Sequence, residues 1–243
     1  MDFVAQEYWD QGYATMALDR VDDQDPIRIW IEKHFKGTSG SCFEVGCFPG
    51  RYLGVFGELG YEVNGIDLTP RVSDDFPQYL EGRGFKVGQF TQGDFLKTEP
   101  NAQFDVVCSF GFIEHYSNWD EVIKKHFEWL KPGGHLVLET PNFKGAFQYL
   151  LHRLVDQNNL SRHNTASMVP HQWAQLTRDA GLEVIQAGYL GTFLFWEDQQ
   201  DRNIFQKIAL KGIRVLAKIL PRALPEGLPA FAPFCALIAR KPI

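Results

Sequence analysis

Residues 41–68 read SCFEVGCFPGRYLGVFGELGYEVNGIDL and predict one compact strand–helix–strand unit. A short apolar run, residues 42–45, leads into a turn that contains Gly46 and Gly50. A helical pattern follows, because Val55, Phe56 and Leu59 recur on one face of a 3.6-residue period. A second apolar run, residues 61–66, ends in Asp67. We therefore expect a βαβ unit that closes in a carboxylate.

The chemistry of this unit indicates a nucleoside site. A glycine turn after a buried strand lets a ligand approach the bare backbone, and the helix behind it offers unpaired N–H groups. A carboxylate such as Asp67 at the end of the next strand can accept both hydroxyls of a ribose. The dinucleotide spacing G-x-G-x-x-G is broken, because Phe48 and Arg51 stand where its second and third glycines would fall. This spacing argues against NAD or FAD but leaves a nucleotide-binding oxidoreductase as an alternative.

Residues 44–50, EVGCFPG, resemble the first motif E/D-x-G-x-G-x-G of the class I S-adenosylmethionine (SAM) methyltransferases, with Phe48 in place of the middle glycine. The resemblance implies that the loop touches the methionine part of SAM and that the acid matching Asp67 binds the ribose. The residues that it implies for the cofactor in this unit are Glu44, Gly46, Cys47, Phe48, Gly50, Asp67 and Leu68.

A second part of the resemblance follows the expected third strand, residues 85–90. The triplet Gly93-Asp94-Phe95 stands where the family places an acid that accepts a hydrogen bond from the adenine amino group. A carboxylate suits an exocyclic amine because the amine only donates. The residue after the acid often flanks the ring, so the resemblance implies that role for Phe95.

A third part begins with the apolar run 104–110, which fits a central parallel strand covered on both faces. It leads into residues 111–116, GFIEHY, which resemble the fourth methyltransferase motif and the segment where substrate and methyl group meet. Phe110 and Gly111 are implied cofactor contacts. Residues 130–138, LKPGGHLVL, match a phrase that is typical of the superfamily. A helix is also expected over residues 70–81, and strands are expected over residues 135–140, directly after the glycines, and over residues 182–190. The implied fold is α/β and Rossmann-like: a seven-stranded, mostly parallel sheet with an antiparallel last strand, residues 234–240, and helices on both faces.

The domain organisation that we expect is an N-terminal helical cap, residues 1–38, followed by a SAM-binding domain, residues 39–243. Two insertions, at about residues 142–169 and 197–231, are expected to form helical lids, since long connections at the carboxyl ends of parallel strands cover ligands. In the cap, Tyr8 and Trp9 are candidate substrate contacts, with sheet packing as the alternative.

The candidate catalytic residues are histidines. Methyl transfer from a sulfonium needs mainly proximity and alignment, and a hydroxyl or amine acceptor can also need a general base. His115 is the first candidate because it follows the fourth strand, and His163 and His171 are second candidates. Glu114 and Tyr116 are candidate substrate contacts beside it. No metal is expected, because no carboxylate–histidine cluster stands out in the sequence.

The second insertion carries a basic amphipathic helix, residues 204–220. Lys207, Lys211, Arg214 and Lys218 form one stripe, and Ile208, Val215, Leu216 and Ile219 lie on another side. No acid occurs in residues 202–225. One interpretation is a surface for a membrane, a lipid substrate or an anionic ligand. The other is a lid helix whose apolar side packs on the domain and whose charges face water.

Composition limits the other functions. The net charge of −6 argues against a nucleic-acid partner. The four cysteines show no zinc spacing and fit a reduced, cytoplasmic protein without disulfides. No signal peptide and no membrane-spanning run is expected.

The favoured function is a SAM-dependent methyltransferase that acts on a small-molecule acceptor, most simply at a hydroxyl oxygen, as a monomer or homodimer. A lipid- or membrane-associated methyltransferase, a catalytically silent SAM-binding protein and an NAD-dependent oxidoreductase are the alternatives.

Overall fold

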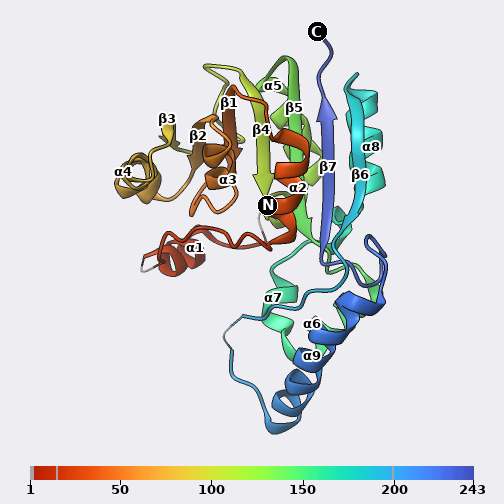
Figure 1. The fold of residues 1–243 in the computed structure, drawn as a ribbon. Coiled ribbons are helices and arrows are strands. Elements are labelled where there is room, and N and C mark those ends of the chain that lie inside the picture. The colour runs from red at the N-terminus through yellow and green to blue at the C-terminus, as the bar shows by residue number, and fades with distance from the viewer. Residues whose placement is uncertain (1–2, 15, 199) are drawn as a thin grey trace.

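A seven-stranded sheet forms the centre of the molecule (Figure 1), which we describe from a computed structural model covering residues 3–14, 16–198 and 200–243. The strands are β1 (Ser41–Val45), β2 (Glu62–Asp67), β3 (Lys86–Gln92), β4 (Phe104–Phe110), β5 (Leu130–Pro141), β6 (Glu183–Leu190) and β7 (Phe234–Arg240). Their order is β3-β2-β1-β4-β5-β7-β6, and β7 runs antiparallel to both of its neighbours while the pairs among β1 to β5 are parallel. The expected fold, including its antiparallel last strand, is confirmed.

The helices alternate with these strands along the chain. They are α1 (Gln6–Tyr13), α2 (Pro26–Phe35), α3 (Leu53–Glu58), α4 (Asp75–Gly82), α5 (Trp119–Glu128), α6 (Ala146–Val155), α7 (Gln157–Ser161), α8 (Pro170–Asp179) and α9 (Ile204–Ala223), with short 3₁₀ helices η1 (Pro70–Ser73), η2 (Ile113–His115) and η3 (Thr165–Ser167). Capping side chains determine where two of these helices begin. The Asp25 carboxylate caps α2 by accepting the N–H groups of Ile27 and Arg28, and Asn203 and Gln206 form a capping box at α9.

Two hydrophobic cores lie on opposite faces of the sheet because successive strand residues point to opposite sides. Cys42 of β1 belongs to the core with Trp30 of α2 and Phe56 of α3. Its neighbour Phe43 belongs to the core with Ile123 of α5 and with α8. Helices therefore cover both faces, as expected.

Two elements differ from the sequence expectations. The helix predicted over residues 70–81 is divided into η1 and α4, with Asp74 between them at φ −104° and ψ −94°. Strand β5 begins at Leu130 rather than at residue 135. Leu130 pairs with Phe104, the register shifts, and regular pairing resumes at His135 after Gly133, whose φ is +78°. Gly133 and Gly134 therefore lie within β5, where the register shifts, although the sequence predicted that the strand would begin after them.

The two insertions fold together below the carboxyl ends of the strands (Figure 1). Helix α6 from the first packs against α9 from the second. A third hydrophobic cluster joins them and consists of Leu151, Val155, Phe193, Leu210 and Ile213. We call this unit the helical subdomain, residues 146–161 and 204–223. Among the described residues, no helix has both the length and the apolar character that crossing a bilayer requires.

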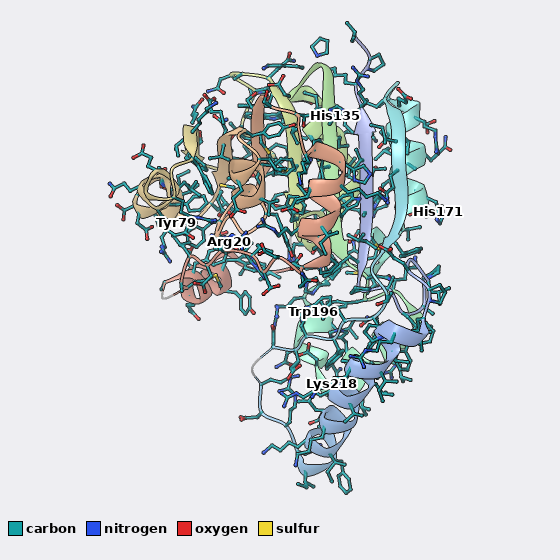
Figure 2. The ribbon with its side chains drawn as sticks, in the orientation of Figure 1. Arg20, Tyr79, His135, His171, Trp196 and Lys218 are labelled. Atoms are coloured by element: carbon teal, nitrogen blue, oxygen red, sulfur yellow. The ribbon has the colours of Figure 1, made fainter. Side chains whose placement is uncertain are left out.

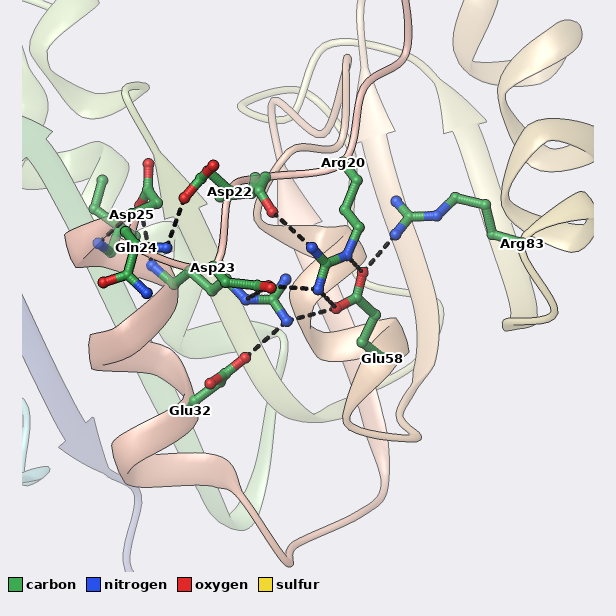
Figure 3. Close-up of polar contacts among 11 residues, drawn as sticks. Arg20, Asp22, Asp23, Gln24, Asp25, Glu32, Glu58 and Arg83 are labelled. Carbon is green, nitrogen blue, oxygen red and sulfur yellow. Dashed lines mark hydrogen bonds and ion pairs between the residues drawn. The ribbon is translucent and has the colours of Figure 1, made fainter.

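An ion network attaches the N-terminal segment to the domain (Figure 3). Glu58 at the end of α3 accepts hydrogen bonds from Arg20 at 2.9 Å, from Arg28 at 2.7 Å and from Arg83. Arg28 also pairs with Glu32 at 2.8 Å, and its side chain is only 8% exposed. A buried guanidinium needs such partners, because an unpaired charge away from water is costly. The network therefore fixes the approach of the chain to α2.

His126 is a fully buried histidine of α5 that the site does not use. Its Nδ1 lies 2.7 Å from the Val122 carbonyl oxygen, so this nitrogen carries the proton. Its Nε2 is buried and has no hydrogen-bond partner among the residues that the structure describes. Its ring packs 4.9 Å from that of Phe95. Burial lowers the pKa of His126 from 6.5 to about 4, because a second N–H would be buried with no acceptor.

We predict that His126 makes the protein acid-sensitive. The folded-state pKa lies below the unfolded value, so the unfolded chain takes up this proton first as the pH falls below about 6.5. The stability that neutral His126 provides is complete above that pH and is lost as the pH falls toward 4. His126→Leu should reduce the loss of unfolding free energy between pH 7 and pH 5 by about 1–2 kcal/mol. Urea unfolding at pH 7 and at pH 5 measures the two unfolding free energies. His171→Leu, on the exposed face of α8, is the control. Equal losses in wild type and His126→Leu would contradict the prediction.

Candidate active site

One cavity of about 220 Å³ lies at the carboxyl ends of β1, β2 and β4, beneath α1. The carboxyl edge of a parallel sheet, where strand order reverses between β1 and β4, is the usual ligand site of this architecture. The lining residues are Val4, Gln6, Trp9, Tyr13, Gly46, Phe48, Pro49, Ile66, Asp67, Leu68, Gly93, Asp94, Phe95, Phe110, Gly111, Phe112, His115 and Tyr116. Twelve of these were predicted from the sequence as site residues: Trp9, Gly46, Phe48, Asp67, Leu68, Gly93, Asp94, Phe95, Phe110, Gly111, His115 and Tyr116.

The loop between β1 and α3 keeps the floor of this cavity open. Gly46 and Gly50 have φ values of +69° and +73°, which side chains rarely adopt. A Cβ atom on Gly46 would lie 2.5 Å from the Phe112 ring, and one on Gly50 would overlap Phe76. Both positions therefore require glycine, and the loop backbone faces the cavity directly.

Phe48, which replaces the middle glycine of the motif, has a structural role in the loop. Its ring is buried and packs 4.9 Å from Tyr13 of α1 and 5.4 Å from Phe76 of α4, with the Arg71 guanidinium 4.7 Å above it. Its backbone N–H donates to Asp67 Oδ2 at 3.0 Å. The departure from the motif thus leaves the backbone donor in place and gives α1 a hydrophobic contact over the cavity.

Two carboxylates lie on the cavity wall. Asp67 Oδ1 accepts the Thr69 N–H at 3.0 Å, and Asp94 Oδ1 accepts the Leu96 N–H at 3.0 Å. Burial raises the pKa of Asp67, and backbone N–H groups from Thr69, Phe48 and Leu68 oppose that shift. Each carboxylate keeps acceptor capacity for a ligand, because a carboxylate has about four lone-pair sites.

Aromatic rings surround the remaining end of the cavity. The Trp9 ring meets the His115 ring edge to face at 5.0 Å, and the rings of Phe112 and Tyr116 lie 5.0 Å apart. His115 Nδ1 lies 3.1 Å from the Arg162 carbonyl oxygen. Burial lowers the pKa of His115 to about 4, so its ring is neutral at pH 7.

The first insertion brings His163 to the same place. The His163 ring lies 4.8 Å from the His115 ring, and its Nδ1 lies 2.7 Å from the Asn159 carbonyl oxygen. The Asn164 N–H donates to the Glu114 carbonyl oxygen at 2.7 Å, which attaches this segment to η2. The pKa of His163 is lowered to about 3, mainly by burial and next by the neighbouring His115. His163 does not itself line the cavity.

Glu114 lies behind His115 and also does not line the cavity. Its side chain is completely buried, and neither carboxyl oxygen has a hydrogen-bond partner among the described residues. Burial raises the pKa of Glu114 to about 8. The ligand atoms of Glu114, His115 and His163 lie within 4.8 Å of one another. This cluster does not stand out in the sequence, because His115 and His163 are 48 positions apart and only the path of the first insertion brings them together.

Five other predicted residues lie outside the cavity lining. Glu44 and Cys47 are buried beneath the loop, and Gly50 shapes the loop without reaching the cavity. Tyr8 is 43% exposed, and its ring receives the Arg162 guanidinium at 4.6 Å. His171 is exposed near the start of α8, at the side of the sheet next to β6 (Figure 2), and it does not line the cavity.

Sequence reasoning missed six lining residues: Val4, Gln6, Tyr13, Pro49, Ile66 and Phe112. Pro49, Ile66 and Phe112 are neighbours of predicted residues, and the aromatic character of Tyr13 was a usable signal. The sequence contains no comparable signal for Val4 and Gln6, because only the path of α1 across the edge of the sheet brings them to the cavity.

The residues present fit SAM. A loop whose backbone is kept bare by two glycines faces the cavity, and the two carboxylates on its wall have free acceptor capacity for donor groups such as the hydroxyls and the amine of SAM. Fold and cavity together define a class I methyltransferase that uses SAM. The chain belongs to the methyltransferase domain family, whose family model matches residues 18–187. It is therefore an enzyme of this class and not a nicotinamide oxidoreductase.

Known proteins similar to this chain carry the same fold. A ubiquinone biosynthesis O-methyltransferase from Azoarcus sp. (strain BH72) is 28% identical over 193 residues, which cover 75% of this chain and 80% of the relative. A SAM-dependent methyltransferase from Archaeoglobus fulgidus superposes with a TM-score of 0.56 at 19% identity, covering 97% and 99% of the two chains. The N-methyltransferase NodS from Bradyrhizobium japonicum WM9, in complex with S-adenosyl-L-homocysteine, superposes with a TM-score of 0.53 at 14% identity, covering 91% and 90%.

We predict that Asp67→Asn weakens S-adenosylhomocysteine binding strongly. A charge-assisted hydrogen bond contributes about 1.5–3 kcal/mol, so loss of the charge at Asp67 should lower affinity roughly tenfold to a hundredfold. Asp94→Asn should have a smaller effect, because a single amine is its expected partner. Calorimetric titration measures both, with Asp120→Asn on the exposed side of α5 as the control and NAD as the negative ligand. Wild-type affinity in Asp67→Asn, with an unchanged melting temperature, would remove this residue from the cofactor site.

Proposed function

We propose that this enzyme transfers the methyl group of SAM to a hydroxyl oxygen of a small, partly apolar aromatic acceptor. The observation that carries the proposal is the far end of the cavity, where a neutral histidine, His115, stands against the rings of Trp9, Phe112 and Tyr116. Aromatic walls favour a flat apolar ring, and a neutral imidazole can hold or accept a hydroxyl proton. The relative from Azoarcus sp. is named an O-methyltransferase, which supports the same class of acceptor atom.

The cofactor roles that we propose follow from the wall of the cavity. Asp67 accepts the ribose hydroxyls, Asp94 accepts the adenine amine, and the backbone of residues 46–48 contacts the methionine part. Phe95 and Leu68 supply apolar surface next to the adenine. SAM itself supplies an activated methyl group on a sulfonium, so these residues act by orientation and by exclusion of water.

His115 is the residue that we propose to contact the acceptor hydroxyl. Its Nδ1–H donates to a backbone carbonyl, so Nε2 holds the lone pair. Its lowered pKa, about 4, makes it a weak base by itself, since a general base is most effective near the working pH. Orientation of the hydroxyl is therefore its main role in this proposal.

We predict that the protein methylates oxygen in preference to nitrogen or sulfur. Alkylated catechols and phenols should give O-methyl products by mass spectrometry, and matched alkylanilines and thiophenols should give none at the same concentration. Asp67→Asn, assayed in parallel, controls for chemistry that does not use the cofactor site. If only the alkylaniline were methylated, the prediction would be wrong, and the acceptor group would be an amine.

A second proposal concerns the helical subdomain, which we propose docks on a membrane surface that contains anionic lipid. Several apolar residues of α9 do not pack on the domain: Phe205 is 78% exposed, and Ile208, Val215, Leu216 and Ile219 are also exposed. Only Leu210 and Ile213 of this helix are buried. This exposure argues against a simple lid helix, whose apolar side would be covered.

The neighbouring helix extends the same surface. Tyr149, Leu150 and Leu154 of α6 are exposed, and α6 packs beside α9. Lys207, Lys211 and Lys218 form a stripe along one side of these apolar residues of α9, with Lys218 labelled in Figure 2. An apolar face with interspersed lysines has the composition of an interfacial helix, which buries its apolar side among lipid headgroups and attracts anionic lipid. Such a surface would give the enzyme access to an acceptor that partitions into membranes.

We predict that vesicles containing phosphatidylserine sediment the protein at low salt and that high salt releases it. Each lysine near an anionic surface contributes about 1 kcal/mol, so Lys207→Gln with Lys211→Gln should weaken binding by roughly tenfold or more. Phe205→Ser with Ile208→Ser should also weaken it. Ile185→Ser, at an exposed site on β6, is the matched control. No sedimentation with phosphatidylserine vesicles would remove the membrane proposal and leave the methyltransferase proposal in place.

The compartment that we propose is the cytoplasm. Cys42, Cys47, Cys108 and Cys235 are all free and buried. Free cysteines of this kind are typical of proteins in a reducing compartment.

A further inference from the structure

Three side chains from two distant segments converge next to the acceptor end of the cavity. Glu114 and His115 belong to η2, directly after β4, and His163 lies between α7 and η3 in the first insertion. One potential ligand atom from each lies within 4.8 Å of the others. Within residues 3–14, 16–198 and 200–243, no other group of three metal-ligating side chains meets this condition.

Both histidines are held in the tautomer that a metal ligand requires. Their Nδ1 atoms face the carbonyl oxygens of Arg162 and Asn159, at 3.1 and 2.7 Å. A carbonyl oxygen only accepts, so each Nδ1 carries the hydrogen and each Nε2 presents a lone pair. Metal-ligating histidines are commonly oriented in this way by a backbone carbonyl.

Glu114 supplies the anionic ligand. Its side chain has no exposed surface, and neither of its carboxyl oxygens has a hydrogen-bond partner in the part of the chain that the structure describes. Buried polar groups are almost always satisfied, so a pair of unpartnered carboxyl oxygens calls for a positively charged partner. The Arg162 side chain does not fill that role, because its guanidinium pairs with Asp198 and lies over the Tyr8 ring at 4.6 Å.

We propose that Glu114, His115 and His163 bind a divalent transition-metal ion, with Zn²⁺ as the first candidate. Two imidazoles and one carboxylate suit Zn²⁺ or Fe²⁺ better than Mg²⁺, which prefers oxygen ligands. Three protein ligands leave at least one coordination position open, as in catalytic zinc sites. Because His115 belongs both to this cluster and to the cavity lining, the open position is placed near the acceptor end.

The role of the ion rests on the proposed hydroxyl acceptor. A divalent ion that binds the acceptor oxygen lowers the pKa of its hydroxyl, and the proton leaves to solvent. The oxygen then reacts as an anion. With the ion bound, the His115 Nε2 lone pair is used for coordination, so the ion replaces His115 as the group that contacts the acceptor oxygen.

The binding test uses the full chain, freed of metal with a chelator and titrated with Co²⁺ as a spectroscopic probe. We expect one equivalent to give visible absorption typical of four- or five-coordinate Co²⁺ and to be displaced by Zn²⁺. Glu114→Gln and His163→Asn should each lose the bands, while His34→Asn on α2 keeps them. Circular dichroism and S-adenosylhomocysteine affinity confirm that each variant is folded. Absence of Co²⁺ binding in wild type, or wild-type spectra in folded Glu114→Gln, would overturn the site.

The role is tested separately by methylation. Chelation should lower turnover of the catechol at least tenfold, with S-adenosylhomocysteine affinity unchanged, and added Zn²⁺ should restore it. Equal turnover with and without metal would overturn the role and leave the proposed function standing. Absence of turnover on every acceptor under both conditions would count against the proposed function, while the Co²⁺ titration would still decide the site.

Discussion

The hydrogen bond from the Phe48 N–H to Asp67 joins the two halves of the cofactor site. It connects the loop after β1 to the end of β2 at 3.0 Å. The same residue contributes a ring that holds α1 through Tyr13. Loop shape, carboxylate orientation and the cover over the cavity therefore depend on one short segment. Gly46 and Gly50 make this possible, since their positive φ values turn the backbone toward the cavity.

Burial controls the charge of nearly every titratable group at the acceptor end. It lowers the pKa of His115 and His163 and raises that of Glu114, so an ion-free cluster is electrically neutral near pH 7. Neutral imidazoles are good ligands but weak bases. The environment that weakens His115 as a proton acceptor thus keeps both imidazoles in the neutral form that binds a cation, whereas Glu114 would release its proton when the cation binds.

The sequence was sufficient for the sheet because its signals are local. Apolar runs, glycine turns and caps predicted all seven strands, and the run 104–110 matched β4 at both ends. The motif resemblance located Asp67 and Asp94 on the cavity wall. The cluster of Glu114 and His163 could not be predicted, because it depends on the path of the first insertion. The packing of α6 on α9 was hidden for the same reason, since periodicity identifies an apolar face but not the element that covers it.

The first insertion connects the two proposed activities physically. Buried Asp156, between α6 and α7, accepts hydrogen bonds from Asn159 at 3.0 Å and from Gln200 at 3.1 Å, which joins the insertion to the segment before α9. A few residues later, Asn164 donates to the carbonyl oxygens of Glu114 and Tyr116 beside the cavity. His163 therefore lies on a short path between the helices with exposed apolar residues and the acceptor end. The helices that we propose meet the membrane and the histidine that we propose binds the cation therefore belong to one continuous, hydrogen-bonded segment of the chain.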